Sequence, residues 1–123
     1  MPSRTPHKFR LIFSTVSDEE QAVSIARKLV SEQLVACVNI IGPIRSIYRW
    51  RDSINDDREY LLLIKTRASL YPKVEKRIRK LHTYEVAEVI SVNIDRGSPP
   101  YLKWMLQSTD TQRASESQKR KKQ

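Results

Sequence analysis

His82 and the polar side chains that follow it are the strongest candidates for chemistry in this sequence of 123 residues. A neutral imidazole is a good ligand for copper or zinc. Tyr84, Glu85 and Glu88 bring a phenol and two carboxylates, which would add negative charge to such a site. A histidine just past a helix can instead cap backbone carbonyls and complement the helix dipole. We favour this structural role for His82 and keep metal ligation as the alternative.

Cys37 is the second candidate ligand, because a thiolate that faces a cleft is a soft metal ligand. It lies between Ala36 and Val38, where a free cysteine behaves as a small hydrophobic residue. We therefore expect Cys37 to be buried and inert. A single cysteine excludes an internal disulfide and fits a reducing compartment, so we expect a cytoplasmic protein.

The sequence carries no motif that indicates a catalytic reaction. It has no G-x-S-x-G or H-E-x-x-H pattern, and Gly42 and Gly97 are its only glycines, which excludes a glycine-rich phosphate loop. We expect no catalysis and no organic cofactor. An acid–base enzyme is an alternative, whose candidate groups are Glu59, His82, Tyr84 and Glu88.

Hydrophobic periodicity predicts the elements that would position these groups. Four predicted strands span residues 8–16, 35–50, 58–66 and 85–94, and three predicted helices begin near Ser17, Ser69 and Ser98. The second strand bends at Gly42-Pro43, and residues 52–57 form the turn of a long hairpin. A loop is expected at 96–98.

The predicted helices have recognisable ends and buried faces. Ser17 and Glu20 have the spacing of a capping box, and the helix that they begin runs to about residue 33. Its apolar stripe comprises Ala22, Ile25, Ala26, Leu29 and Val30. In the closing helix, Tyr101, Trp104 and Met105 are expected to face inward.

The order strand, helix, strand, strand, helix, strand predicts an α+β, ferredoxin-like sandwich with an extra C-terminal helix. Both main helices then cover one face of an antiparallel sheet, and the other face lacks a cover. The unbroken apolar run 61–64 makes the strands apolar on both faces. An exposed apolar sheet of this size would aggregate, so we expect a symmetric homo-oligomer to cover it.

Composition indicates one globular domain over residues 8–109, between disordered segments at 1–7 and 110–123. The net charge is +9, and two thirds of this excess lies in residues 1–10 and 110–123. We interpret the basic tail as a solvated segment. No apolar run is long enough to span a membrane.

Four segments together resemble the CutA family of divalent-cation-tolerance proteins over roughly residues 8–108. They are ACVNIIGPIRSIYRW (36–50), LLLIKTRASLYP (61–72), LHTYEVAEVI (81–90) and PYLKWM (100–105). The resemblance implies a homotrimer in which three sheets meet around a threefold axis. It also implies a non-catalytic protein that binds copper or other divalent ions and acts in metal-ion response or as a signalling scaffold.

The resemblance also implies that six residues line a cleft between subunits: Trp50, Glu59, Lys65, Tyr84, Glu85 and Glu88. His82 matches the histidine of the family's H-P-Y-E-V-P-E segment, in which Thr83 and Ala87 replace the prolines. Ser14 and Leu81 replace a cysteine and a second histidine of copper-binding relatives, which argues against a high-affinity copper site of that kind. Asp52 replaces the usual glycine of the hairpin turn, which suggests a different turn type.

An RRM-like nucleic-acid-binding module is the alternative function, because it shares the same element order and a positive charge. The third strand reads Leu61-Leu62-Leu63-Ile64, however, where the RRM has aromatic residues that stack on bases. We therefore expect no nucleic-acid partner. The sequence identifies no protein partner.

Overall fold

A computed structural model describes residues 3–4 and 7–110 as one four-stranded antiparallel sheet, a two-stranded pair and three α-helices. The helices are α1 (Glu19–Ser31), α2 (Tyr71–Leu81, preceded by the 3-10 turn Ala68–Leu70) and α3 (Pro99–Ser108). The strands are β1 (Ser3–Arg4), β2 (Phe9–Val16), β3 (Cys37–Trp50), β4 (Ser53–Arg67), β5 (Ile90–Asn93) and β6 (Arg96–Gly97). The main sheet has the order β3-β4-β2-β5. The mixed α+β class is thereby confirmed.

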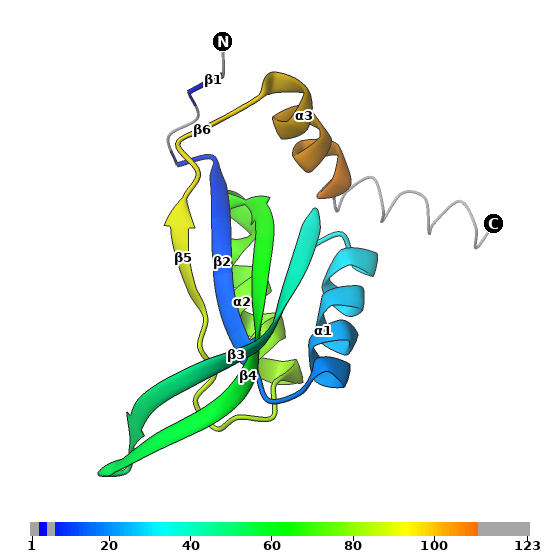
Figure 1. Cartoon of the computed structure of the whole chain (residues 1–123). Helices are drawn as coiled ribbons and strands as arrows, with labels where there is room; N and C mark the ends of the chain where they lie inside the picture. Colours follow the sequence, from blue (N-terminus) through cyan, green and yellow to red (C-terminus); the bar gives the residue numbers. More distant parts are fainter. Residues whose placement is uncertain (1–2, 5–6, 111–123) are drawn as a thin grey trace, which may run out of the picture.

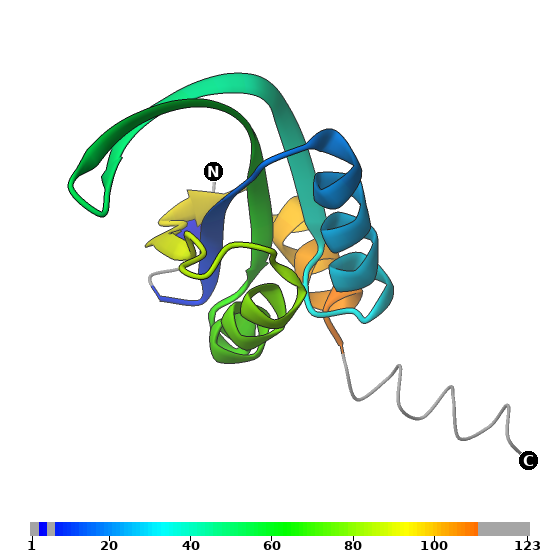
Figure 2. The ribbon, with the colours of Figure 1, turned by 90° about the horizontal axis from the view of Figure 1, so that it is seen from below.

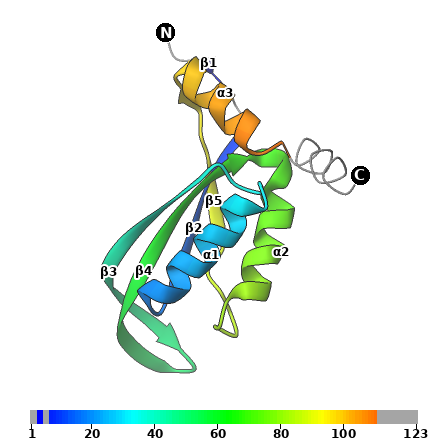
Figure 3. The same cartoon turned by 90° about the vertical axis from the view of Figure 1, so that its right-hand side faces the viewer.

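The main core lies between the sheet and the layer formed by α1 and α2, which share one face of the sheet (Figure 3). Side chains alternate along a strand, so β2 and β4 each send every second residue to this face. The fully buried contributors include Ile12, Leu62 and Ile64 from the strands and Leu29 and Ile78 from the helices. This face therefore holds the hydrophobic core that fixes both helices.

The opposite face of the sheet is apolar and only partly covered. Helix α3 packs over one end of it, in a cluster of Phe9, Ala36, Leu102 and Met105 (Figure 1). The rest is open, with Ile90 59% and Val92 51% exposed. As expected, the described part of the chain does not complete the cover of this face.

The inward-facing residues of the closing helix α3 are not all those that were predicted. Met105 is buried as expected, but Tyr101 and Trp104 are 41% and 42% exposed. Their rings lie 5.2 Å apart on the outside of α3. Leu102 takes the buried position instead, because α3 rests on Phe9 with the face that carries Leu102 and Met105.

The hairpin of β3 and β4 is longer than predicted, and its turn is at Arg51 and Asp52. Both residues have positive φ, 49° and 64°, as the central residues of a type I′ turn do. The segment expected to be a turn, 52–57, is instead largely paired with β3. Across this pairing Arg45 binds Asp56 with two contacts of 2.9 and 2.6 Å. The hairpin curves out beyond the rest of the sheet (Figure 2).

The predicted bend in β3 is present. The pairing shifts register between Ile41 and Ile44, at the Gly42-Pro43 pair. A side chain at Gly42 would collide with the ring of Tyr60, so glycine is needed for this close approach.

Several element ends also differ from the predictions. Asp18, not Ser17, caps α1, since its carboxylate accepts a 2.7 Å hydrogen bond from the Gln21 amide. The helix ends at Ser31, and Val30 is 43% exposed because it lies outside the stripe that faces the sheet.

The structure differs from the prediction in the last strands, because the predicted strand 85–94 is shorter and an additional strand pair is present. Strand β5 spans only Ile90–Asn93, and residues 83–89 cross the edge of the sheet without strand pairing. Residues 96 and 97, expected to be a loop, pair as β6 with β1 in the stretch expected to be disordered. Residues 111–123 of the predicted tail lie outside the described residues. No helix in the described ranges is long and apolar enough to span a membrane.

Candidate ligand-binding cleft

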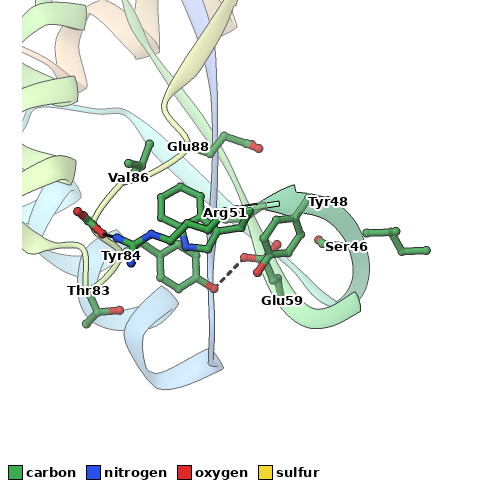
Figure 4. A pocket seen from close by; sticks show the side chains of 13 residues that line it. Ser46, Tyr48, Arg51, Glu59, Thr83, Tyr84, Val86 and Glu88 are labelled. Carbon is green, nitrogen blue, oxygen red and sulfur yellow. Dashed lines mark hydrogen bonds and ion pairs between the residues drawn. The ribbon is translucent and has the colours of Figure 1, made fainter. Parts of the chain in front are cut away.

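A cleft of about 820 Å³ lies between the far half of the hairpin and the segment 83–88 (Figure 4). The hairpin supplies one wall because it curves, and the segment supplies the other because it leaves α2 without joining the sheet. The lining residues are Thr15, Ser46, Ile47, Tyr48, Trp50, Arg51, Glu59, Thr83, Tyr84, Glu85, Val86, Ala87 and Glu88.

Glu59 is the buried charged residue of the cleft, at 6% exposure. Its carboxylate accepts a 2.9 Å hydrogen bond from the hydroxyl of Tyr84. No cationic side chain among the described residues pairs with it. A buried carboxylate with one neutral donor is poorly compensated, so Glu59 makes the cleft a region that attracts positive charge.

Two groups beside Glu59 have raised pKa values, first because they are desolvated and second because they lie near its carboxylate. Burial raises the pKa of the Tyr84 phenol, and the hydrogen bond to Glu59 raises it further, so Tyr84 stays protonated and keeps donating. Desolvation raises the pKa of the Glu88 carboxyl, and the negative charge of Glu59 adds to the shift. Glu59 and Glu88 therefore interact electrostatically within the cleft.

The rim of the cleft carries one ion pair between the hairpin and the 83–88 segment and two further contacts within the hairpin. The guanidinium of Arg51 pairs with Glu85 at 2.7 Å and lies 5.3 Å from the centre of the Trp50 ring. The Tyr48 hydroxyl donates to Asp57 at 2.5 Å. These contacts place two aromatic rings on the hairpin wall of the cleft.

His82 lies just after α2, is buried, and uses both ring nitrogens inside the chain. Its Nε2 lies 2.6 Å from the carbonyl oxygen of Thr15, and its Nδ1 accepts a 3.0 Å hydrogen bond from the backbone amide of Tyr84. A carbonyl can only accept and an amide can only donate, so the ring is the neutral Nε2–H tautomer. A metal ion at His82 would have to displace one of these two contacts.

The structure brings together five of the six residues expected to line a cleft, namely Trp50, Glu59, Tyr84, Glu85 and Glu88. Lys65 lies elsewhere, with its ammonium 5.8 Å from the centre of the Tyr101 ring near α3. Cys37 was expected to be buried, but it is partly exposed. It is paired with Lys65 across β3 and β4 and does not line the cleft.

The described residues contain no cluster of three or more histidine, cysteine, aspartate or glutamate side chains that could hold a metal ion. Ser14 is buried at 1% exposure, and its hydroxyl has no hydrogen-bond partner within the described part of the chain. Leu81 packs against the main core. One chain therefore does not assemble a metal centre around His82.

Sequence reasoning missed several lining residues, above all Tyr48, Arg51 and Val86. The available signal was the alternation along the hairpin, which places Tyr48 and Trp50 on the same face of their strand. The curvature that turns them toward residues 83–88 depends on tertiary structure and has no local sequence signal.

The chain is similar to known proteins over nearly all of its described length. A family model for the CutA1 divalent ion tolerance protein matches residues 10–108. Protein CutA of Mus musculus is 44% identical over 106 residues, which cover 86% of this chain and 60% of the mouse protein. The divalent-cation tolerance protein CutA of Thermus thermophilus is 42% identical over 99 residues, or 80% of this chain and 96% of that protein.

Solved structures agree with this similarity. The Thermus thermophilus Cut A1 structure has a TM-score of 0.80 and 42% identity, and it covers 82% of this chain and 98% of its own. CutA from Synechococcus elongatus has a TM-score of 0.84 at 29% identity, with coverage of 89% and 96%. The Arabidopsis thaliana relative is named chloroplastic and the Archaeoglobus fulgidus structure periplasmic, and none of these names denotes a reaction. The chain belongs to the CutA1 divalent ion tolerance protein family.

Proposed function

We propose that this protein is a non-catalytic, homotrimeric scaffold in the response to divalent cations, and that its cleft holds a divalent cation loosely. The observation that carries the proposal is the buried Glu59 carboxylate, which has one neutral hydrogen bond and no cationic partner among the described residues. Family membership supports the link to divalent ions.

The groups of the cleft fit a hydrated hard cation better than copper. Carboxylate oxygens from Glu59 and Glu88 suit ions such as Mg²⁺ or Mn²⁺, which keep several waters when few protein ligands are present. Copper prefers imidazole and thiolate ligands, but both nitrogens of His82 are engaged and Cys37 lies outside the cleft. Copper held by His82 residues of several chains is the alternative.

The open face of the sheet supports the trimeric part of the proposal. Its half-exposed aliphatic side chains include Ile41, Ile90 and Val92, which the described chain leaves in water. Burying such a face against copies of the same chain is favourable by about 25 cal/mol per Å² of apolar surface.

Two further observations support other parts of the proposal. The strand order β3-β4-β2-β5 with two helices on one face supports the ferredoxin-like description. The single cysteine supports a cytoplasmic protein.

Titration of the purified full chain with MgCl₂, MnCl₂, ZnCl₂ and CuSO₄ tests the cation site. We expect weak binding of Mg²⁺ or Mn²⁺ that falls at least about fivefold in Glu59→Gln, because a lost carboxylate removes charge and a ligand. Glu20→Gln removes an exposed carboxylate outside the cleft and should leave binding unchanged. Absence of binding at millimolar concentrations, or equal losses in both variants, would overturn the proposed site.

A further inference from the structure

We propose that the α2 groove docks an extended acidic peptide of a partner protein, one that alternates carboxylate and aliphatic side chains. The α2 groove is the hollow of about 630 Å³ between α2 and the segment 84–89. Its lining comprises Glu75, Lys76, Arg79, Lys80, Tyr84, Glu85, Val86, Ala87 and Val89. This proposal goes beyond the proposed function, because it concerns a different hollow and a ligand of opposite charge.

The α2 wall of the groove is strongly basic. Lys76, Arg79 and Lys80 have i, i+3, i+4 spacing, which places them on one face of the helix, and all three are exposed. None of the three forms an ion pair with a described residue. Arg77, on another side of the same helix, pairs with Glu32 at 2.8 Å. The groove therefore faces water with positive charge that the described chain does not neutralise.

The acidic residues of the groove offset only part of this charge. Glu85 pairs with Arg51 at 2.7 Å across the rim of the cleft, so Glu75 is the one acidic lining residue left to face the three cations. A partner that carries its own carboxylates would thus find unpaired lysine and arginine side chains on α2.

The other wall of the groove is apolar. Val86 is 66% exposed, and Ala87 and Val89 line the groove beside it. In an extended peptide, successive side chains point to opposite sides. Carboxylates at alternate positions would contact α2, and the aliphatic residues between them would cover Val86.

Neither helix electrostatics nor nucleic-acid binding accounts for both walls of the groove. Basic residues in the last turn of a helix complement its dipole, which is a reason for Arg79 and Lys80 but for neither Lys76 nor the exposed Val86. A nucleic acid would satisfy the cations of α2 with its phosphates but would leave Val86 without an apolar partner. An acidic peptide uses both walls.

The basic α2 wall of the groove lies away from the surface expected to be buried in the proposed trimer. Helix α2 covers one face of the sheet, and the apolar surface expected to be buried between chains is on the opposite face (Figure 3). Loss of trimer formation and loss of peptide binding are therefore separate outcomes.

Fluorescence anisotropy with the full chain tests the proposal, using a short labelled peptide of alternating glutamate and valine as the probe. We expect the double variant Lys76→Glu, Arg79→Glu to bind at least about tenfold more weakly, because both groove cations become anions. The matched control is Lys28→Glu, Lys73→Glu, which makes the same change of charge at exposed helix positions outside the groove. It should weaken binding less than about threefold, through long-range charge alone. Circular dichroism checks that all variants are folded.

Peptide and wall variants complete the test. Val86→Ser should weaken binding a few-fold without changing its salt dependence, and a peptide of alternating glutamine and valine should not bind. Equal losses in the two double variants, equal binding of the glutamine peptide, or equal binding of a single-stranded DNA of the same charge would overturn the proposal. The DNA result would make α2 a general polyanion surface.

Discussion

At the scale of single residues, the cleft is organised by a chain of hydrogen bonds that runs through Tyr84. His82 holds the backbone of Tyr84 and is itself held by the carbonyl of Thr15, and the hydroxyl of Tyr84 reaches Glu59. The His82 and Tyr84 rings are also in contact, with centroids 4.6 Å apart. His82 is thus a positioning residue that sets where the Tyr84 donor lies.

Replacement of His82 by alanine is expected to reduce the free energy of unfolding by about 2 kcal/mol, since a buried carbonyl and amide lose their partners. Urea unfolding followed by circular dichroism measures this loss. Cation affinity, measured where the variant is folded, should change little. A stable variant that loses cation binding would make His82 a ligand and contradict the structural role.

The raised pKa of Glu88 gives a pH-dependent prediction. Because the folded pKa is above the ordinary value of 4.5, ionised Glu88 destabilises the folded state, and stability falls as the pH rises from about 4.5 through the folded pKa. Glu88→Gln should therefore be more stable than wild type at neutral pH and equally stable below pH 4.5. Urea unfolding at both pH values tests the sign.

The pKa of Glu88 also tests the electrostatic interaction between Glu59 and Glu88. In Glu59→Gln the negative neighbour is gone, so an NMR titration of the Glu88 carboxyl should give a lower pKa than in wild type. The part due to desolvation should remain. An unchanged pKa would mean that Glu59 and Glu88 do not interact, and would remove Glu88 from the proposed cation site.

At the scale of elements, the hairpin turn is the clearest position at which a substitution should stabilise the protein. Arg51 and Asp52 both adopt positive φ, which glycine tolerates at lower energy. Asp52→Gly should raise the free energy of unfolding by about 0.5 to 1 kcal/mol. Ser53→Gly, at the first paired position of β4, is the control and should lower it. Thermal unfolding of both variants measures the difference, and a shared sign would contradict the turn assignment.

Helices and central strands could be predicted because their signals are local. Ile25 and Leu29 have helical spacing, and the apolar run 61–64 indicated a buried strand, so α1 and β4 followed from periodicity. The stretch 52–57 was wrongly predicted as a turn, because aspartate and asparagine are typical of turns. Asp56 and Asp57 instead pair across the hairpin with Arg45 and Tyr48, which local sequence does not reveal.

The site could be predicted only in part, for the same reason. Resemblance to the CutA family correctly grouped Glu59, Tyr84 and Glu88 in the cleft. It also placed Lys65 there, but Lys65 lies beside Tyr101 instead. The engagement of Nε2 of His82 depends on Thr15, a residue distant in sequence. Contacts of this kind require the fold, so no periodicity or spacing indicates them.

At the scale of the whole molecule, one apolar sheet face remains in water in the single chain. Leu63 lies in the middle of this face, beside Phe13 and opposite Asn39. Leu63→Glu should abolish oligomer formation, because a charge would enter the centre of the buried surface. Val30→Glu, which places the same charge at an exposed position of α1, should leave the oligomer intact.

Sedimentation equilibrium of the wild-type chain at micromolar concentration is the decisive test of whether this face is covered in solution. We predict a single species with three times the 14.4 kDa mass of the chain. A soluble species of 14.4 kDa with no tendency to associate would refute the trimer, since the open face formed by β2, β4 and β5 would then be stable in water.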